Sequence, residues 1–541
     1  MTKKIVLSFI FLLQLVVLFI YGDHNPFFDG RVYLNCLTEI NNDTAVNYFG
    51  FSQYGCFAHS SYFYMFLVSM VTKFLGGSLW VLYSFLMLLM MLATYAFYRI
   101  NEILFSYDVS EDASFKTNVV TAIFAFYPVF LSNIFHFNID FGVFVFSIFY
   151  LFLLLTHRFF WAFLASWFLV YSKEVGAIPY FFISVGYVFF WKGLSFKKGC
   201  RFILHKFYLT LAGISYIFYT LKFKEILHPG EMWTQMSSGI LSFQGLMNNA
   251  LFGIWDIFSN RFVLPLYAFI LTVNFNWLMV FFIAASIVSV LFFKAKKSPK
   301  VRILNAHHSQ NLIFFLFFAM FYGATRFFSL LNARYFLYFY PFLLLAFRSS
   351  MDILGHYFVL LNKQRLKRLI YITVMFLVVC SNFRTFDPVS KKIFGSFYFG
   401  EHKFLKVTSL TEECCGFARD QMIYNLQGLA LSKLMKQLHE TLLEEKEKQQ
   451  KKIVLSFSPA SNFYLFDAFL PEDFLLITDE EIFRQRMNPG YAGGDFYFVH
   501  IPLFPTNTFP SFVEHFELLE KKTLSFDSHH LILYKWKIPQ L

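Results

Sequence analysis

Apolar runs of about 20 residues recur along the first 380 residues of the chain, and this feature constrains the fold most strongly. A helix needs about 20 mostly apolar residues to cross the hydrocarbon core of a bilayer. Hydrophobic residues make up 57% of the sequence and charged residues only 15%, against about 25% charged residues in soluble domains. The 81 phenylalanines cannot all be buried in one soluble core. The sequence therefore excludes an ordinary cytosolic enzyme, a disordered protein and a disulfide scaffold.

The apolar runs predict an α-helical, polytopic membrane protein with about 11 transmembrane helices. Two further apolar runs, 59–75 and 261–274, are expected to lie at the outer interface or to re-enter the membrane. The first run lacks a small-residue cleavage site, so it is expected to be an uncleaved span. The spans are predicted near residues 5–21, 79–98, 118–135, 139–155, 159–172, 175–191, 205–221, 275–293, 309–328, 333–347 and 369–381.

The formal net charge of +12 is explained by topology. Basic residues cluster in the loops 192–206, 294–302 and 348–368, whereas the loop 22–60 contains Arg31 as its one basic residue. Cytoplasmic loops carry the excess of lysine and arginine in membrane proteins. We therefore expect a cytoplasmic N-terminus and, because the number of spans is odd, an extracytoplasmic C-terminus. The phenylalanine-rich chain with its simple basic N-terminus favours a bacterial inner membrane. Binding to nucleic acid is therefore not needed to explain the net positive charge.

The composition changes after residue 381, which predicts two domains: a membrane domain over 1–381 and an extracytoplasmic domain over 382–541. Residues 22–78 form the first extracytoplasmic loop. In the tail, helices are expected at 418–450, 479–487 and 509–521. Apolar runs at 453–457, 474–477, 496–501, 523–526 and 531–536 predict strands between them, and hence a small α/β domain.

The first outer loop carries the residue that most resembles a catalytic group. Asp29 follows the first span closely, so its carboxylate is expected beside the lipid headgroups, where a low dielectric favours a general base. Asp23 is the rival for that role. The alternative interpretation is that this segment is only a solvated acidic loop. Cys36 and Cys56 share this loop, and an oxidising compartment would allow a disulfide between them.

Other polar groups lie at the outward ends of the predicted helices. His136 and Asp140 bracket the turn between the third and fourth spans, and an ionisable residue at membrane depth is often functional. Lys173 lies beside Glu174 at a later turn, where a local ion pair is the alternative. Arg326 and Arg334 are also expected at this face, and each alone is consistent with an interfacial anchor. These acidic and basic groups suit a reaction on a phosphate-linked lipid.

This pattern resembles the GT-C membrane glycosyltransferases, in particular the protein O-mannosyltransferase and lipid A aminoarabinose transferase relatives. The resemblance spans most of residues 1–400 and rests on order and topology more than on identity. Its motifs are Asp29-Gly-Arg-Val-Tyr33, Asn138-Ile-Asp140, Ser172-Lys-Glu174, and Arg334-Tyr335 followed by Pro341. The family's His-Pro-Pro segment is replaced by His59-Ser60-Ser61.

The resemblance implies a role for each matching residue. Asp29 would be the base that activates the acceptor, and Asp140 an auxiliary carboxylate that orients acceptor or sugar. Tyr33 would contact substrate. The lipid phosphate would be held by Lys173, Arg326 and Arg334. Some relatives use a divalent metal, but no ligand spacing typical of a metal site occurs here, so no cofactor is expected to be required.

The expected activity is transfer of a sugar from a polyprenyl-phosphate donor to a glycan, lipid or protein acceptor on the extracytoplasmic face. A flippase or transporter for lipid-linked sugars is one alternative, and it predicts inverted repeats with broken helices near the middle of the membrane. An O-antigen polymerase or ligase is another. A structural subunit with a sensory outer domain is the third, and it predicts that Asp29 and Asp140 can be replaced freely.

Overall fold

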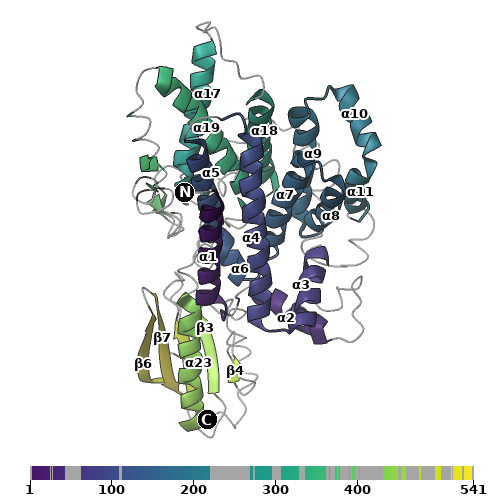
Figure 1. Cartoon of the computed structure of the whole chain (residues 1–541). Coiled ribbons are helices and arrows are strands. Elements are labelled where there is room, and N and C mark those ends of the chain that lie inside the picture. The colour runs from purple at the N-terminus through teal and green to yellow at the C-terminus, as the bar shows by residue number, and fades with distance from the viewer. Residues whose placement is uncertain are drawn as a thin grey trace.

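The apolar runs of the sequence fold into helices, most of them packed side by side (Figure 1). The computed structural model describes residues 3–24, 26, 29–42, 62–108, 112–219, 269–271, 275–294, 306–327, 336–360, 365, 369, 372–374, 376–377, 389, 393, 395–396, 401–402, 430–448, 453–458, 474–476, 494–500, 513, 516–526 and 529–538. Within the helices and strands, some side chains are also not described.

The helical body contains most of the described residues. Its first half consists of α1 (Lys3–Tyr21), α2 (Asp29–Asn42), α3 (Tyr62–Leu75), α4 (Leu79–Leu104), α5 (Ala113–Ala125), α6 (Pro128–Phe135), α7 (Asp140–Leu155) and α8 (Phe159–Val170). Its second half consists of η2 (Glu174–Gly176), α9 (Ala177–Val185), the π-helical η3 (Gly186–Trp191), α10 (Phe196–His205), η4 (Phe207–Thr210), α11 (Leu211–Phe218), α17 (Asn276–Lys294), α18 (Ala306–Phe327) and α19 (Tyr340–Leu360).

Two of these segments are long and apolar enough to cross a bilayer among the described residues: Leu79–Leu104 and the α5–α6 run Ala113–Phe135. Pro128 begins α6, because proline fits the first turn of a helix but not its interior. Seven further apolar helices are shorter. The mainly helical architecture is thus as predicted, whereas the number of 11 spans stays a prediction.

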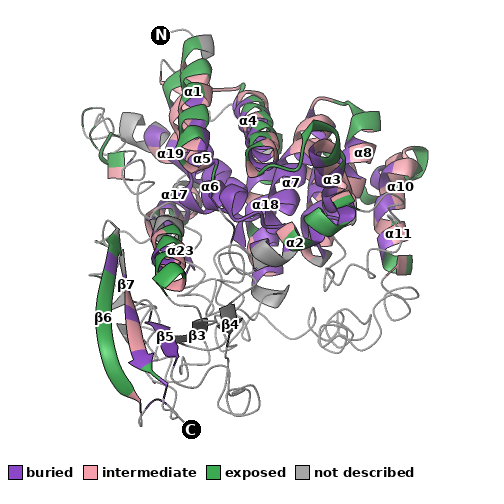
Figure 2. Cartoon of the chain, turned by 90° about the horizontal axis from the view of Figure 1, so that it is seen from below, coloured by how far each residue is buried: buried purple, intermediate pink, exposed green. Residues whose placement is uncertain are grey.

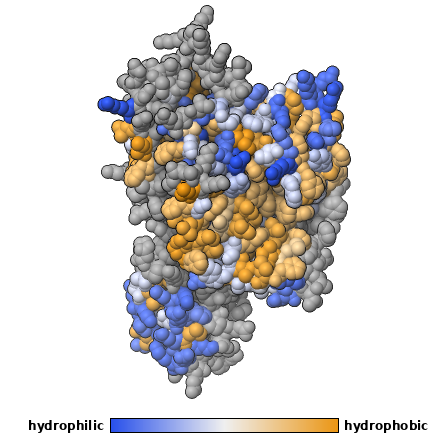
Figure 3. Space-filling view, in the orientation of Figure 1, coloured by the Kyte–Doolittle hydropathy of each residue, from blue (hydrophilic) through white to orange (hydrophobic). Residues whose placement is uncertain are grey.

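The helical body buries some polar side chains in its apolar core and exposes many large apolar side chains on its surface. Gln14 on α1 is buried, and its side-chain amide donates to the Thr94 hydroxyl (3.2 Å) and to the Ala125 carbonyl (3.3 Å), linking three helices. Large apolar side chains are exposed on α1, α4, α8, α11 and α17. Figure 3 shows this hydrophobic surface across the body, and Figure 2 shows the buried centre. An apolar exterior this large fits a lipid environment.

A small mixed sheet follows the helical body. It has the order β4-β3-β5-β7-β6, with β3 parallel to β4 and β5, and β7 antiparallel to β5 and β6. Its strands are β3 (Ile453–Ser458), β4 (Phe474–Leu476), β5 (Asp495–His500), β6 (Glu517–Phe526) and β7 (His529–Lys537). The helix α23 (Ala430–Lys448) lies beside this sheet (Figure 1). The strands β1 (Gly395–Ser396) and β2 (Glu401–His402) pair with each other and form a separate two-stranded sheet.

One prediction in the tail is wrong. A helix was expected over 509–521, but β6 begins at Glu517 and pairs with β7 from Glu517↔Lys537 onward. The sequence ELLEKK suits a helix surface. It also suits an exposed edge strand, where charged side chains discourage pairing with other chains. Tertiary pairing with β7 decides between the two.

The sheet lies at the same end of the molecule as α2 and α3, whereas α10 and the start of α18 lie at the opposite end (Figure 1). We call these the sheet end and the far end of the body. The topology predicted from the sequence, in which the first loop and the tail share one side of the membrane, stays a prediction.

Candidate functional site

A buried ion pair at the sheet end of the body joins two residues singled out from the sequence. The Lys173 ammonium donates to both carboxylate oxygens of Asp140, at 2.9 Å each. Asp140 is 3% exposed and Lys173 is 4% exposed. Asp140 is the first residue of α7, where the partial positive charge of the helix N-terminus also favours a carboxylate. A charge-assisted bidentate contact of this kind is among the stronger polar interactions in proteins.

Glycines allow the two halves of the pair to approach. A Cβ at Gly142 would lie 2.8 Å from the Tyr64 ring and 2.9 Å from the Ser172 hydroxyl, so α7 packs closely on the segment that carries Lys173. At Gly176 a Cβ would lie 2.0 Å from the Leu169 carbonyl oxygen. The chain after α8 therefore folds back on that helix and holds Lys173 in a tight turn.

The turn before Asp140 is a helix cap of unusual composition. After α6, the Phe137 amide donates to the Ile134 carbonyl (3.1 Å) and the Asn138 amide to the Asn133 carbonyl (3.2 Å). This is the Schellman pattern, which usually places glycine in the left-handed conformation. Here Phe137 adopts it, with φ of 44°, and its side chain is fully buried. Strained backbone of this kind clusters at functional sites.

The start of α2 rests directly on this turn. A Cβ at Gly30 would lie 1.7 Å from the His136 carbonyl oxygen, so only glycine fits. The Tyr83 hydroxyl also joins the segments, since it lies 2.6 Å from the His24 carbonyl oxygen and 2.8 Å from that of Phe135. The backbone of Asp29 is therefore next to the turn that leads to Asp140.

Two histidines pack against each other in this region. The rings of His24 and His136 lie 5.0 Å apart in an edge-to-face arrangement, and both residues are buried. Burial lowers the pKa of His24 well below its ordinary value, and the nearby His136 lowers it further. In the sequence, His24 lies between the exposed Asp23 and Asp29.

The remaining predicted site residues are placed as follows. Asp29 begins α2 and its side chain is not described, while Tyr33 on the same helix is buried in the apolar core. Arg326 lies in the last turn of α18 and its side chain is not described either. Gly323, three residues before Arg326 on the same helix, packs on Ile178 at the start of α9. Arg334 lies outside the described residues.

Cys36 on α2 is disulfide-bonded. Cys56, the expected partner, lies outside the described residues. A disulfide fits a loop that faces an oxidising compartment.

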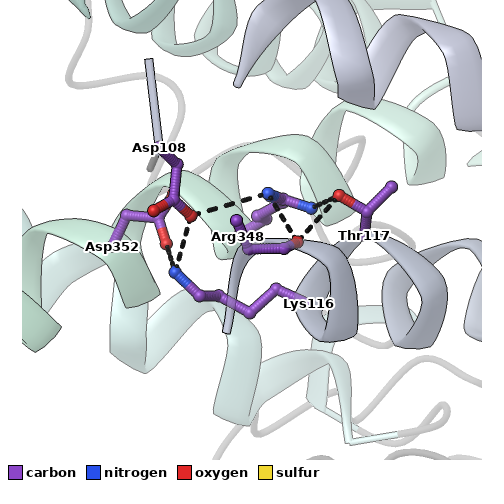
Figure 4. Close-up of polar contacts among 6 residues, drawn as sticks. Asp108, Lys116, Thr117, Arg348 and Asp352 are labelled. Carbon is purple, nitrogen blue, oxygen red and sulfur yellow. Dashed lines mark hydrogen bonds and ion pairs between the residues drawn. The ribbon is translucent and has the colours of Figure 1, made fainter. Parts of the chain in front are cut away.

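A second buried charge cluster lies at the far end of the body (Figure 4). Lys116 on α5 donates to Asp108 at 2.8 Å and also to Asp352 on α19. Arg348 donates to Thr117 and lies 3.8 Å from the Asp108 carboxylate. From Tyr83 to Leu104, α4 rises roughly 30 Å, so this cluster is remote from Asp140.

Sequence reasoning placed Arg348 in a cytoplasmic basic loop and missed its partners. A signal was present, because Arg348 and Asp352 are four residues apart on one helix, and Lys116 opens an apolar run. We name Asp108, Lys116, Arg348 and Asp352 the far-end cluster.

At the sheet end, Lys173 supplies a buried cation and Asp140 a buried carboxylate. No group of three or more His, Cys, Asp or Glu that could hold a metal ion occurs among the described residues.

The sequence matches no protein-family model and no curated protein. Its structure is similar to that of ArnT from Cupriavidus metallidurans bound to undecaprenyl phosphate, with 12% identity, 97% of each chain covered and a TM-score of 0.46. It is also similar to the archaeal oligosaccharyltransferase AglB from Archaeoglobus fulgidus in complex with an inhibitory peptide and a dolichol-phosphate. That likeness has 12% identity, covers 92% of this chain and 69% of that chain, and has a TM-score of 0.46.

Proposed function

We propose that this chain is a membrane glycosyltransferase that moves a sugar from a polyprenyl-phosphate donor to an acceptor at the sheet end of the body. One observation carries the proposal: the start of α2 with Asp29, the turn before Asp140 and the buried Lys173 gather at one end of a lipid-exposed bundle. The three segments come from distant parts of the sequence. In the proposed topology the chain crosses the membrane about 11 times, and this end is extracytoplasmic.

The reaction needs one base and one anion site. The Asp29 carboxylate takes the proton of the acceptor hydroxyl or amine, and the acceptor atom forms a bond to the anomeric carbon. The bond from that carbon to the phosphate oxygen breaks, and the polyprenyl phosphate leaves with the electron pair. Lys173, with Arg326 and Arg334, stabilises the charge that develops on the phosphate. No metal takes part in this scheme.

Asp140 has a positioning role in this scheme. Because it holds Lys173 through two hydrogen bonds of 2.9 Å, it fixes the ammonium where the phosphate is to bind. The neighbouring helices leave an apolar exterior against which the polyprenyl tail can lie. The activated bond is in the donor, so no nucleotide-binding fold is needed.

Sugar transfer by the purified chain tests the proposal. Wild type, Asp29→Asn and Asp23→Asn would each be offered a panel of polyprenyl-phosphate sugars in lipid. Loss of a general base costs roughly 10²–10⁴ in rate, so Asp29→Asn should lose transfer while Asp23→Asn keeps it. The reverse result would make Asp23 the base. Release of no sugar from any donor by the wild type would contradict the transferase and favour the flippase, which is then assayed by transport.

A further inference from the structure

The helix α10 (Phe196–His205) presents three different faces at the edge of the helical body (Figures 1 and 2). One face packs on the protein: Gly199 is buried, and a Cβ there would lie 2.6 Å from the Phe189 ring. The Phe196 ring stacks on the same Phe189 ring, with a centroid distance of 6.2 Å. These contacts fix how the helix is rotated against the body.

The second face is apolar and largely exposed. Phe196 is 78% exposed and Leu204 is 74% exposed, and Phe207, which follows the helix, is 58% exposed. Exposed aromatic and aliphatic side chains of this size are typical of contact with acyl chains.

The third face is basic. Lys197, Lys198 and Arg201 are exposed, and none of them forms an ion pair within the part of the chain that the structure describes. Lys192 and Lys206 flank the helix. No acidic residue occurs in the sequence between Glu174 and Glu225. Figure 3 shows hydrophilic residues at the upper right, where α10 lies, directly above a hydrophobic surface.

We propose that α10 is a binding surface for anionic phospholipid headgroups. The exposed apolar face enters the acyl region, while Lys197, Lys198 and Arg201 reach the phosphates at the membrane surface. Each basic residue near an anionic membrane surface strengthens binding about fivefold. The inference rests on the membrane location of the chain and not on sugar transfer. It concerns the far end of the body, away from Lys173.

Native mass spectrometry of the full chain in neutral detergent tests the proposal. The dissociation constant of the first bound phosphatidylglycerol would be compared with that of phosphatidylcholine. Wild type should prefer phosphatidylglycerol, and K197Q/K198Q should weaken that binding on the order of 25-fold. R201Q alone should weaken it about fivefold. Higher ionic strength should weaken wild-type binding more than it weakens binding by the double variant.

The matched control is K521Q/K522Q, which removes the same two charges from exposed positions on β6. It should leave phosphatidylglycerol binding within about twofold of wild type, since β6 lies at the other end of the molecule. Equal weakening in both double variants, or no preference of the wild type for phosphatidylglycerol, would overturn the proposal. Because no sugar donor is present, neither result depends on catalytic activity.

Discussion

Replacing Lys173 by methionine removes the cation of the buried pair and leaves a side chain of similar length. The Asp140 carboxylate then loses two hydrogen bonds of 2.9 Å in a place where it is 3% exposed. Hydrogen bonds to charged groups contribute about 1.5–3 kcal/mol each. Breaking a buried pair by removing one partner costs about 3–5 kcal/mol, because a buried charge is left uncompensated. We therefore expect Lys173→Met to lower the free energy of unfolding by about 3–5 kcal/mol.

The matched control is Arg99→Met on α4. Arg99 contacts Glu102 at 3.0 Å, but the two side chains are 45% and 21% exposed. A surface pair of this kind contributes less than about 1 kcal/mol. The double variant D140N/K173M removes both charges, and we expect it to recover at least about half of the loss. Unfolding in mixed detergent micelles, followed by circular dichroism, measures all three. Equal losses for Lys173→Met and Arg99→Met would show that burial of the Lys173–Asp140 pair adds nothing to its contribution to stability.

Three further perturbations have expected outcomes. Gly30→Ala forces a Cβ against the His136 carbonyl oxygen, so it should abolish sugar transfer. Gly77→Ala is the control and should keep transfer, because a Cβ at Gly77 meets nothing within 4 Å. Lys116→Met in the far-end cluster should lower the free energy of unfolding by about 3–5 kcal/mol without changing the donor KM, measured by unfolding and by kinetics. Burial raises the pKa of Glu445, but hydrogen bonds from Lys448, Lys535 and Tyr497 outweigh it and lower the pKa to about 2. The stability that Glu445 contributes should therefore be present above pH 4.5 and be lost as the pH falls toward 2, and Glu445→Gln should remove that pH dependence in an acid titration of the β-sheet signal.

Local patterns predicted the fold well where neighbouring residues determine the structure. The apolar run 453–457 corresponds to β3, which spans Ile453–Ser458, because short apolar runs between turn residues favour strands. The start of β6 could not be predicted, since its charged residues also suit a helix and the pairing partner Lys537 is 20 positions away.

The sequence singles out Asp140 and Lys173 separately, but it does not predict that they pair. Asp140 and Lys173 were both recognised as ionisable groups at helix ends, and a local contact of Lys173 with Glu174 was the alternative. Their pairing spans 33 positions and depends on close packing at Gly142, which no periodicity reveals. The contact of Lys116 with Asp352 spans 236 positions. His24 was missed because one histidine in a loop has no pattern that separates a buried ring from an exposed one.

Sugar transfer by wild type and Asp29→Asn, measured side by side with one polyprenyl-phosphate donor, tests whether Asp29 is the general base. Asparagine keeps the size of the side chain and removes the base. We expect Asp29→Asn to lower the transfer rate by a factor of roughly 10²–10⁴ and to leave the unfolding midpoint and donor binding unchanged. Equal rates for the two proteins would contradict the assignment of Asp29 as the base.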